Sequence, residues 1–206
     1  MTREAILLLG PTGAGKTPLG DALEAAGLRG RRCVHFDFGR NLRRACEAGG
    51  AFGLNGEDAA HVRQLLRDGL LLEDERFNIA IGILAGFLAE RAVQPADLLI
   101  MNGLPRHAGQ ARDLAPFLDV RRVVHLRATP EVVFERIRLN SGGDRTGRAD
   151  DSPGEIAGKV RLFEKRTLPL LDHYRAVGVI VTGVTIEVHT TAQDVVRELE
   201  VMGPKP

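Results

Sequence analysis

A glycine-rich stretch near the start of the chain, residues 10–17 with the sequence GPTGAGKT, has the residue types and spacing to hold a phosphate. It fits the pattern G-x-x-x-x-G-K-[ST] and lies between an apolar segment and a helical pattern, as this loop requires. Gly13 and Gly15 can turn backbone N–H groups inward to form an anion-binding nest at the helix N-terminus. Lys16 adds a positive charge, and the Thr17 hydroxyl suits Mg²⁺, which prefers oxygen ligands. The stretch predicts a nucleoside triphosphate site but not the reaction.

A second group of candidate residues follows the apolar segment 98–101. In open α/β sheets ligands collect at the carboxyl ends of the strands, so Asn102 and Arg106 are expected beside the phosphate loop. An arginine can bind a phosphate through two parallel hydrogen bonds. A Pro-Arg pair is equally typical of a surface turn, so both interpretations stay open on these residues alone.

A third group consists of basic residues on and around the glycine-rich stretch 140–148. Phosphoryl transfer needs cations that stabilise the charge spreading onto the transferred group, and a closing loop that carries arginines would also exclude water. A solvated charged hairpin explains the same residues, and taken alone the charges favour that interpretation. The residues are Arg136, Arg138, Arg145, Arg148, Lys159 and Arg161.

Short apolar segments alternate with longer helical patterns along the chain and must position these residues. Continuous apolar segments are typical of parallel strands buried on both faces, so the alternation predicts an α/β fold with a parallel sheet covered by helices. Thr129 and Thr191 are expected helix N-caps. The predicted strands are 5–9, 33–36, 98–101, 123–126 and 185–188, and the predicted helices lie near 16–26, 40–48, 58–67, 73–92, 109–117, 130–139, 153–176 and 192–202.

The composition limits the class of protein. The 206 residues suit one domain, and a formal net charge of +1 gives no overall field to attract nucleic acid or an acidic membrane. No apolar segment approaches the roughly 20 residues of a membrane-spanning helix, and the start of the chain does not resemble a secretory signal. Cys33 and Cys46 have no zinc or CxxC spacing and are expected to be reduced thiols. We expect a cytoplasmic protein without nucleic-acid or membrane partners.

Taken together, the motifs resemble those of the adenylate kinase and nucleoside monophosphate kinase family. Residues 102–106, NGLPR, with the later Gln110 are similar to the family's Asp-Gly-aromatic-Pro-Arg block and its glutamine. Residues 147–151, GRADD, followed by 167–170 and Tyr174, resemble its Gly-Arg-x-Asp-Asp and Thr-x-Pro…Tyr patterns. Weaker matches lie at 35–43 and 69–72. With the phosphate loop, these blocks cover nearly the whole chain in the family's order.

The resemblance implies a three-layer P-loop kinase fold with a central five-stranded sheet. The single domain, residues 1–206, would comprise a core (1–34, 73–138 and 152–206), an acceptor-binding lobe (35–72) and a short lid (139–151). Mg²⁺ is the implied cofactor, with Thr17 and Asn102 at the metal. The implied ATP-binding residues are Gly13, Ala14, Gly15, Lys16, Thr17 and Arg136, the acceptor-binding residues are Gly39, Arg43, Leu72, Arg106 and Gln110, and the catalytic residues are Lys16, Arg106, Arg148 and Lys159.

Several residues depart from the family's pattern. Asn102 stands where the family usually has an aspartate, which removes a negative charge near Mg²⁺. Lys159 replaces an arginine and cannot form a bidentate contact. Asn140 lies near another expected arginine, and Arg138 and Arg145 are the candidates to replace it. These changes bear on the rate and on metal binding, and they leave the expected fold unchanged.

We expect a monomeric enzyme that moves the γ-phosphoryl group of ATP to a nucleoside monophosphate, with AMP as the favoured acceptor, by in-line displacement. Two alternatives stay open. Phe38 stands where a threonine commonly contacts the acceptor, and Arg40 replaces an aspartate, which leaves room for a pyrimidine monophosphate or another small metabolite as acceptor. Asn102 and Lys159 leave room for a sensor that binds ATP without turnover.

Overall fold

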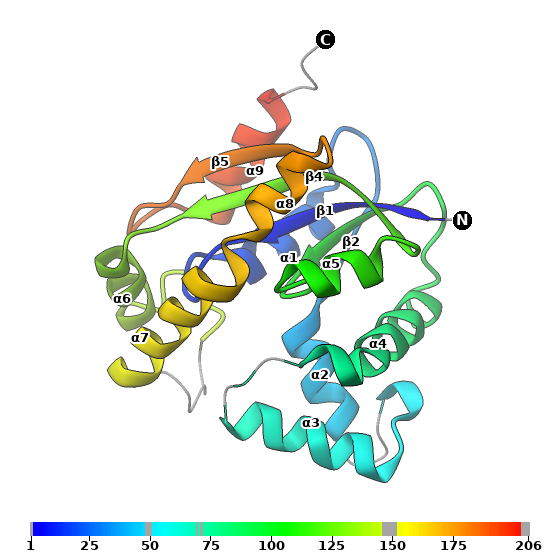
Figure 1. The fold of residues 1–206 in the computed structure, drawn as a ribbon. Coiled ribbons are helices and arrows are strands. Elements are labelled where there is room, and N and C mark those ends of the chain that lie inside the picture. The colour runs from blue at the N-terminus through cyan, green and yellow to red at the C-terminus, as the bar shows by residue number, and fades with distance from the viewer. Residues whose placement is uncertain (1, 48–50, 69, 71, 146–151, 203–206) are drawn as a thin grey trace.

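A central parallel sheet organises the molecule, and the computed structural model describes residues 2–47, 51–68, 70, 72–145 and 152–202. The strands are β1 (Arg3–Leu9), β2 (Cys33–Asp37), β3 (Leu98–Asn102), β4 (Leu118–Arg127) and β5 (Ile180–Thr185). Their order is β2-β3-β1-β4-β5, and every neighbouring pair is parallel (Figure 1). β2 and β3 are buried at every position, as strands covered on both faces must be. The predicted five-stranded parallel sheet is therefore confirmed.

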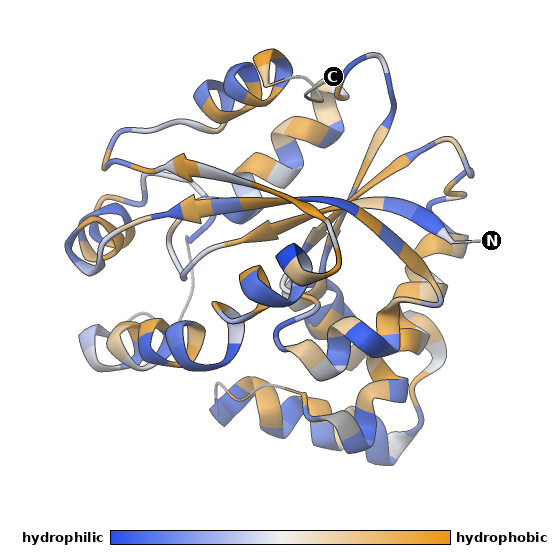
Figure 2. Cartoon of the chain, turned by 45° about the horizontal axis from the view of Figure 1, so that its top comes forward, coloured by the Kyte–Doolittle hydropathy of each residue, from blue (hydrophilic) through white to orange (hydrophobic). Residues whose placement is uncertain are grey.

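Helices cover both faces of this sheet and complete the three predicted layers. Alternate residues of β1 point to opposite faces, so Ile6 and Leu8 belong to one apolar cluster and Leu7 and Leu9 to the other. Figure 2 shows apolar residues along much of the strands and a mixture of polar and apolar residues on the outer helices. The helices are α1 (Lys16–Ala26), α2 (Phe38–Cys46), α3 (Gly56–Asp68), α4 (Phe77–Glu90), α5 (Ala108–Leu114), α6 (Pro130–Arg138), α7 (Pro153–Leu162), α8 (Leu170–Ala176) and α9 (Ala192–Val201).

Two parts of the chain lie at the margin of this core. Helices α2 and α3 contact each other below the sheet in Figure 1 and carry most of the predicted acceptor lobe, residues 35–72. Helices α6 and α7 form a separate small apolar cluster, and they flank the predicted lid, residues 139–151. Residues 146–151 lie outside the described residues, and the boundary at residue 35 falls within β2. The division into core, lobe and lid stays a prediction.

The structure corrects the position of the last strand and the length of one helix. β5 spans Ile180–Thr185 rather than 185–188, because its pairing with β4 ends at Arg127 and the chain then turns between Glu187 and Thr190. Residues 182 and 183, Thr and Gly, interrupt the apolar pattern by which strands are recognised. The predicted helix 153–176 is divided by a π-helical turn (Phe163–Thr167), and Pro169, which has no backbone N–H to donate, precedes α8.

Both predicted N-caps are confirmed. Thr129 accepts a hydrogen bond from the Val132 N–H at the start of α6, and Thr191 forms a capping box with Asp194 at the start of α9. α2 begins two residues earlier than predicted, because the Asp37 carboxylate accepts from the Arg40 N–H and so caps the helix at Phe38.

A close contact between α1 and β2 gives a stability prediction. Gly20 faces the fully buried His35 side chain, and a methyl group there would collide with the imidazole ring. Gly20→Ala should therefore lower the free energy of unfolding by about 1–3 kcal/mol, measured by urea denaturation.

Gly82 is the matched control, because it lies on the exposed side of α4 with open space around it. Gly82→Ala should raise the free energy of unfolding by about 0.5–1 kcal/mol through helix propensity alone. A Gly20→Ala protein that is as stable as the unchanged protein, or that gains as much stability as Gly82→Ala, would contradict the packing described for Gly20.

Candidate active site

The glycine-rich loop connects β1 to α1 and has the backbone geometry of an anion nest. Gly13 and Gly15 have φ values of 76° and 92°, which glycine adopts without strain, and Gly15 is the N-cap residue of α1. A side chain at residue 13 would also meet Ile137 Cγ1 at 2.8 Å, so glycine lets α6 approach the loop closely. The loop thus combines the backbone N–H groups of a helix N-terminus with close packing against α6.

Lys16 lies inside this loop. Its Nζ donates to the carbonyl oxygens of Gly10 and Pro11, both at 2.7 Å. Desolvation by the surrounding protein lowers the pKa of Lys16 to about 7, and the nearby positive charge of Arg106 contributes to the same shift. A polyanionic ligand would favour the charged form of Lys16, because it would offset both the desolvation and the repulsion.

The carboxyl ends of β2 and β3 place a hydrogen-bonded cluster beside Thr17. Asp37 and Asn102 are register partners at the ends of these two strands. The Thr17 hydroxyl donates to Asp37 Oδ2 at 2.6 Å, and Asn102 Nδ2 donates to Asp37 Oδ2 at 2.9 Å and to Thr17 Oγ1 at 3.0 Å. The structure therefore brings the two predicted metal residues, Thr17 and Asn102, together around a carboxylate that the sequence-based candidates did not include.

Asp37 is almost completely buried, yet it remains ionised. Burial raises its pKa, but the hydrogen bonds from the Thr17 hydroxyl and the Arg40 N–H outweigh burial and hold the pKa of Asp37 below its usual value. One signal in the sequence points to it: an acidic residue ends an apolar strand, as Asn102 ends the next strand. Among the described residues, no group of three or more His, Cys, Asp or Glu side chains could bind a metal alone. A cation here would need further oxygen ligands from a substrate.

Arg106 and Gln110 are fixed by hydrogen bonds at the start of α5. Arg106 Nε donates to the Gly103 carbonyl at 2.9 Å, and the Arg106 N–H donates to Gln110 Oε1 at 2.8 Å. Gln110 Nε2 donates to the Leu72 carbonyl at 2.7 Å. Both ends of the buried Gln110 amide are thus bonded to the chain, and they link the end of the acceptor lobe to Arg106. Burial lowers the pKa of Arg106.

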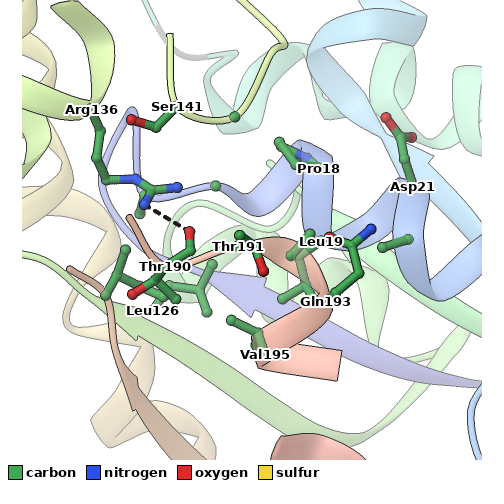
Figure 3. Close-up of a pocket in the computed structure, with 16 residues that line it drawn as sticks. Pro18, Leu19, Asp21, Leu126, Arg136, Ser141, Thr190, Thr191, Gln193 and Val195 are labelled. Atoms are coloured by element: carbon green, nitrogen blue, oxygen red, sulfur yellow. Dashed lines mark hydrogen bonds between the residues drawn. The ribbon is translucent and has the colours of Figure 1, made fainter. Parts of the chain in front are cut away.

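Arg136 anchors α6 to the phosphate loop. Its Nε donates to the Gly13 carbonyl at 3.0 Å, and its Nη1 donates to the carbonyls of Glu187, Val188 and Thr190 at 2.7–3.1 Å. Figure 3 shows its guanidinium extending toward Thr190, and the side chain is 5% exposed. Its position follows from the turn after β5, which the sequence-based strand assignment misplaced.

Two arginines, one in the predicted lid and one just before it, have different environments. Arg145 is buried, and its Nη1 donates a hydrogen bond to Thr12 Oγ1 in the phosphate loop at 3.4 Å. Arg138 is exposed and pairs with Glu135 on its own helix. Arg138 and Arg145 are the candidates to replace the arginine expected near residue 140, and of these two Arg145 is the one that contacts the phosphate loop. Arg148 lies outside the described residues.

A cavity of about 970 Å³ collects most of the predicted site residues. The phosphate loop lines one side, the α2–α3 region lines another, and residues 142–145 with α7 complete it. The predicted residues that line it are Gly13, Gly15, Lys16, Thr17, Gly39, Arg43, Leu72, Asn102, Arg106, Gln110 and Lys159.

A second pocket of about 380 Å³ adjoins the first at Gly15 and contains Ala14 and Arg136. Apolar side chains from α1, β4 and α9, including Leu19, Leu126 and Val195, line it (Figure 3). Thr190, Thr191 and Gln193 add polar groups to the same lining. This combination suits an aromatic ring with polar edges next to a phosphate.

Comparison with known proteins decides the family. No family model matches the chain. An adenylate kinase of Synechococcus sp. (strain WH7803) is 30% identical over 186 residues, which is 87% of this chain and 89% of the relative. An adenylate kinase of Rhodopirellula baltica is 30% identical over 85% of this chain and 83% of its own length. The chain belongs to the adenylate kinase family. The adenylate kinase of Prochlorococcus marinus (strain MIT 9313), 28% identical, extends the match to 96% of this chain.

Membership confirms the resemblance drawn from the motifs and the P-loop kinase fold. It also makes the chain a nucleoside monophosphate kinase, a phosphotransferase that binds ATP. The roles of individual residues stay predictions, and the geometry above is the basis on which we propose them.

The anchoring role of Arg136 is testable through stability. Arg136→Ala would remove hydrogen bonds to four backbone carbonyls, so the free energy of unfolding should fall by at least about 2 kcal/mol in chemical denaturation. Arg138→Ala, two residues later on the same helix, removes only an exposed ion pair and should change it little. Equal effects of the two substitutions would argue against the anchor.

Proposed function

We propose that this enzyme transfers the γ-phosphoryl group of ATP to AMP in a Mg²⁺-dependent reaction that yields two ADP. The observation that supports the proposal is that Lys16 and Thr17 of the phosphate loop line the same cavity as Arg43 and Arg106 on the acceptor side. Direct transfer needs donor and acceptor phosphates within one water-poor space, and this arrangement of cations supports it. The names of the relatives support adenylate as the acceptor.

The donor triphosphate would bind the nest formed by Gly13, Ala14 and Gly15, with Lys16 on its β- and γ-phosphates. The adjoining pocket beside Arg136 would hold the donor nucleoside, because its mixed apolar and polar lining suits a purine. Mg²⁺ held at Thr17 would supply positive charge that offsets the negative charge developing in the reaction. The oxygen-rich set at Thr17 and Asp37 fits such an ion, since Mg²⁺ keeps substrate oxygens and water among its ligands.

The acceptor phosphate would lie between Arg43 and Arg106. Gly39 lines the cavity near the Arg43 guanidinium, and a Cβ at residue 39 would lie 3.9 Å from both Nη atoms of Arg43, so the absence of a side chain keeps this space open. Leu72 and Gln110 would border the acceptor base. An oxygen of the AMP phosphate attacks the γ-phosphorus, and the bond between that phosphorus and the bridging oxygen of the leaving ADP breaks.

Five basic residues would stabilise the transition state. Lys16 and Arg106 would carry positive charge beside the transferred group, and Lys159 lines the same cavity from α7. Arg148 would approach from the lid, and we propose that Arg145 takes the place of the lid arginine missing at residue 140. Their shared effect is to place positive charge where the equatorial oxygens of the phosphoryl group gain negative charge.

Phe38 keeps one alternative acceptor open. It lines the cavity at the position of the family's threonine, and the surrounding Leu42, Leu65 and Leu70 make this side of the cavity apolar. The oxygen and the nitrogen of the Gln110 amide already form hydrogen bonds within the chain. The acceptor base would have to replace these hydrogen bonds or be recognised by other groups. A pyrimidine monophosphate is therefore the second candidate acceptor.

We also propose a cytoplasmic, monomeric enzyme. Cys33 and Cys46 are both free thiols, which is typical of a reducing compartment. Within the ranges that the structure describes, no helix has the length and apolar character to cross a bilayer.

The acceptor panel tests the function directly. Purified enzyme with Mg²⁺ and ATP should release ADP fastest with AMP, more slowly with CMP and UMP, and not at all after the metal is removed with EDTA. If turnover is faster with CMP or UMP than with AMP, the preferred acceptor is a pyrimidine monophosphate. Tight ATP binding without transfer to any acceptor would leave only the sensor interpretation.

Lys16→Met removes the charge that the phosphate loop presents to the transferred group. We expect turnover to fall at least about 100-fold, measured as ADP released per enzyme. Lys165→Met changes an exposed lysine in the π-helical turn and should leave turnover near that of the unchanged enzyme. If Lys16→Met stays active, the loop lysine is not a catalytic residue.

Arg148→Ala tests the predicted lid arginine. We expect kcat to fall by about 100-fold or more, while the midpoint of thermal unfolding stays the same, because the residue would act on the substrate rather than on the fold. Arg161→Ala, an exposed arginine on α7, provides the comparison. Near-normal kcat in purified Arg148→Ala would defeat the assignment.

A further inference from the structure

We propose that Asp37 supplies the carboxylate that orients the metal of bound Mg·ATP, so that the acidic group has moved from the end of β3 to the end of β2. The inference rests on the proposed function and adds a residue to its site. Asp37 acts as a positioning residue through Thr17, and Asn102 assists it. The family resemblance had placed this role at residue 102.

Asn102 cannot provide a negative charge, and its orientation shows where that charge lies. Its Nδ2 donates to both Asp37 Oδ2 and Thr17 Oγ1. An amide turned with its donor side toward this cluster complements an anion at Asp37 and presents no anionic oxygen of its own there. Since Asp37 and Asn102 are register partners on adjacent strands, the acidic group has shifted by about one strand spacing of ~4.8 Å.

The hydrogen bonds of the Thr17 hydroxyl leave it one position for a metal. A hydroxyl has one proton to donate and two lone pairs. Its proton goes to Asp37 Oδ2, and one lone pair accepts from Asn102 Nδ2. One lone pair is left for a cation. Asp37 therefore fixes the hydroxyl rotor, as carboxylates behind metal ligands do in other sites.

Asp37 itself is held rigidly enough to do this. Its Oδ1 accepts from the Arg40 N–H at 2.9 Å and caps α2, while its backbone carbonyl accepts from Asn41 Nδ2 at 2.9 Å. The two carboxylate oxygens thus have separate tasks, one at the helix and one at Thr17. The side chain also lines the cavity that contains Lys16 and Thr17. These contacts are what a carboxylate needs to present a fixed charge to a bound ion.

Asp144 is the competing carboxylate, because it lines the same cavity from the lid segment. Its negative charge reaches Lys16 and Arg136. Asp37 is favoured over it because Asp37 contacts the loop hydroxyl directly and lies at the end of a buried strand.

The experiment measures metal binding rather than turnover. ATP affinity is determined by calorimetry in EDTA and in Mg²⁺, and Mn²⁺ bound to the enzyme–ATP complex is followed by electron paramagnetic resonance. In Asp37→Asn we expect Mn²⁺ affinity in the complex to fall about 10-fold or more. Affinity for metal-free ATP should hold or increase, since a negative charge near the phosphates is removed. Asparagine also caps helices well, so α2 should persist, as circular dichroism would show.

Two further variants make the outcome decisive. The double variant Asp37→Asn with Asn102→Asp returns the carboxylate to β3 and should recover most of the Mn²⁺ affinity, and Asp144→Asn should keep it. The proposal is overturned if Asp37→Asn leaves Mn²⁺ affinity unchanged, if Asp144→Asn causes the loss, or if metal-free ATP binding weakens equally. Transfer to AMP by the unchanged enzyme is assayed separately: binding of Mn·ATP without transfer would refute the proposed function and leave this inference standing.

Discussion

Concentrated positive charge around the phosphate loop is the constraint on which the rest of the structure depends. Lys16 and Arg106 are close enough for Arg106 to lower the pKa of Lys16, and Arg145 adds to the same effect. Asp37 and Asp144 offset part of this charge but do not restore the pKa of Lys16 to its ordinary value. A site that holds cations together against desolvation and repulsion is prepared for a polyanion, whose binding relieves both costs.

The sheet makes this arrangement possible. Parallel strands place all their carboxyl ends at one edge, so β1, β2 and β3 deliver the phosphate loop, Asp37 and Asn102 to a single place. Arg136 then fixes the loop from behind, and Gln110 fixes Arg106 to the end of the acceptor lobe. Lys16 and Arg106 donate hydrogen bonds to backbone carbonyls, which position these two cations without neutralising them.

The sequence predicted most of this fold because its signals were local. A gap-free glycine loop, continuous apolar strands and threonine caps each follow from backbone geometry over a few residues. The strand β5 was misplaced because it lies at the edge of the sheet and carries Thr182 and Gly183, so its apolar pattern is weak. The helix 153–176 was predicted as continuous because the residues of the π-helical turn, FEKRT, are also compatible with an α-helix.

The site was predicted less completely, because its remaining features depend on contacts between distant segments. Asp37 lies beside Asn102 only because β2 pairs with β3. The carbonyl that accepts from Arg136 at Glu187 belongs to the turn after β5, far from Arg136 in the sequence. The hydrogen bonds of Gln110 join residues 38 positions apart. The motifs predict residue types one position at a time, whereas the place of the Asp37 carboxylate beside Asn102 depends on the register in which β2 and β3 pair.

A crystal structure with Mg²⁺, a non-hydrolysable ATP analogue and AMP would test the shared cationic cavity most directly. Lys16 Nζ should leave the carbonyls of Gly10 and Pro11 and contact the β- and γ-phosphates, and the AMP phosphate should lie between Arg43 and Arg106, in line with the γ-phosphorus. AMP bound with its phosphate away from Arg106, or an ATP analogue outside the phosphate loop, would contradict the shared cavity as the site of transfer.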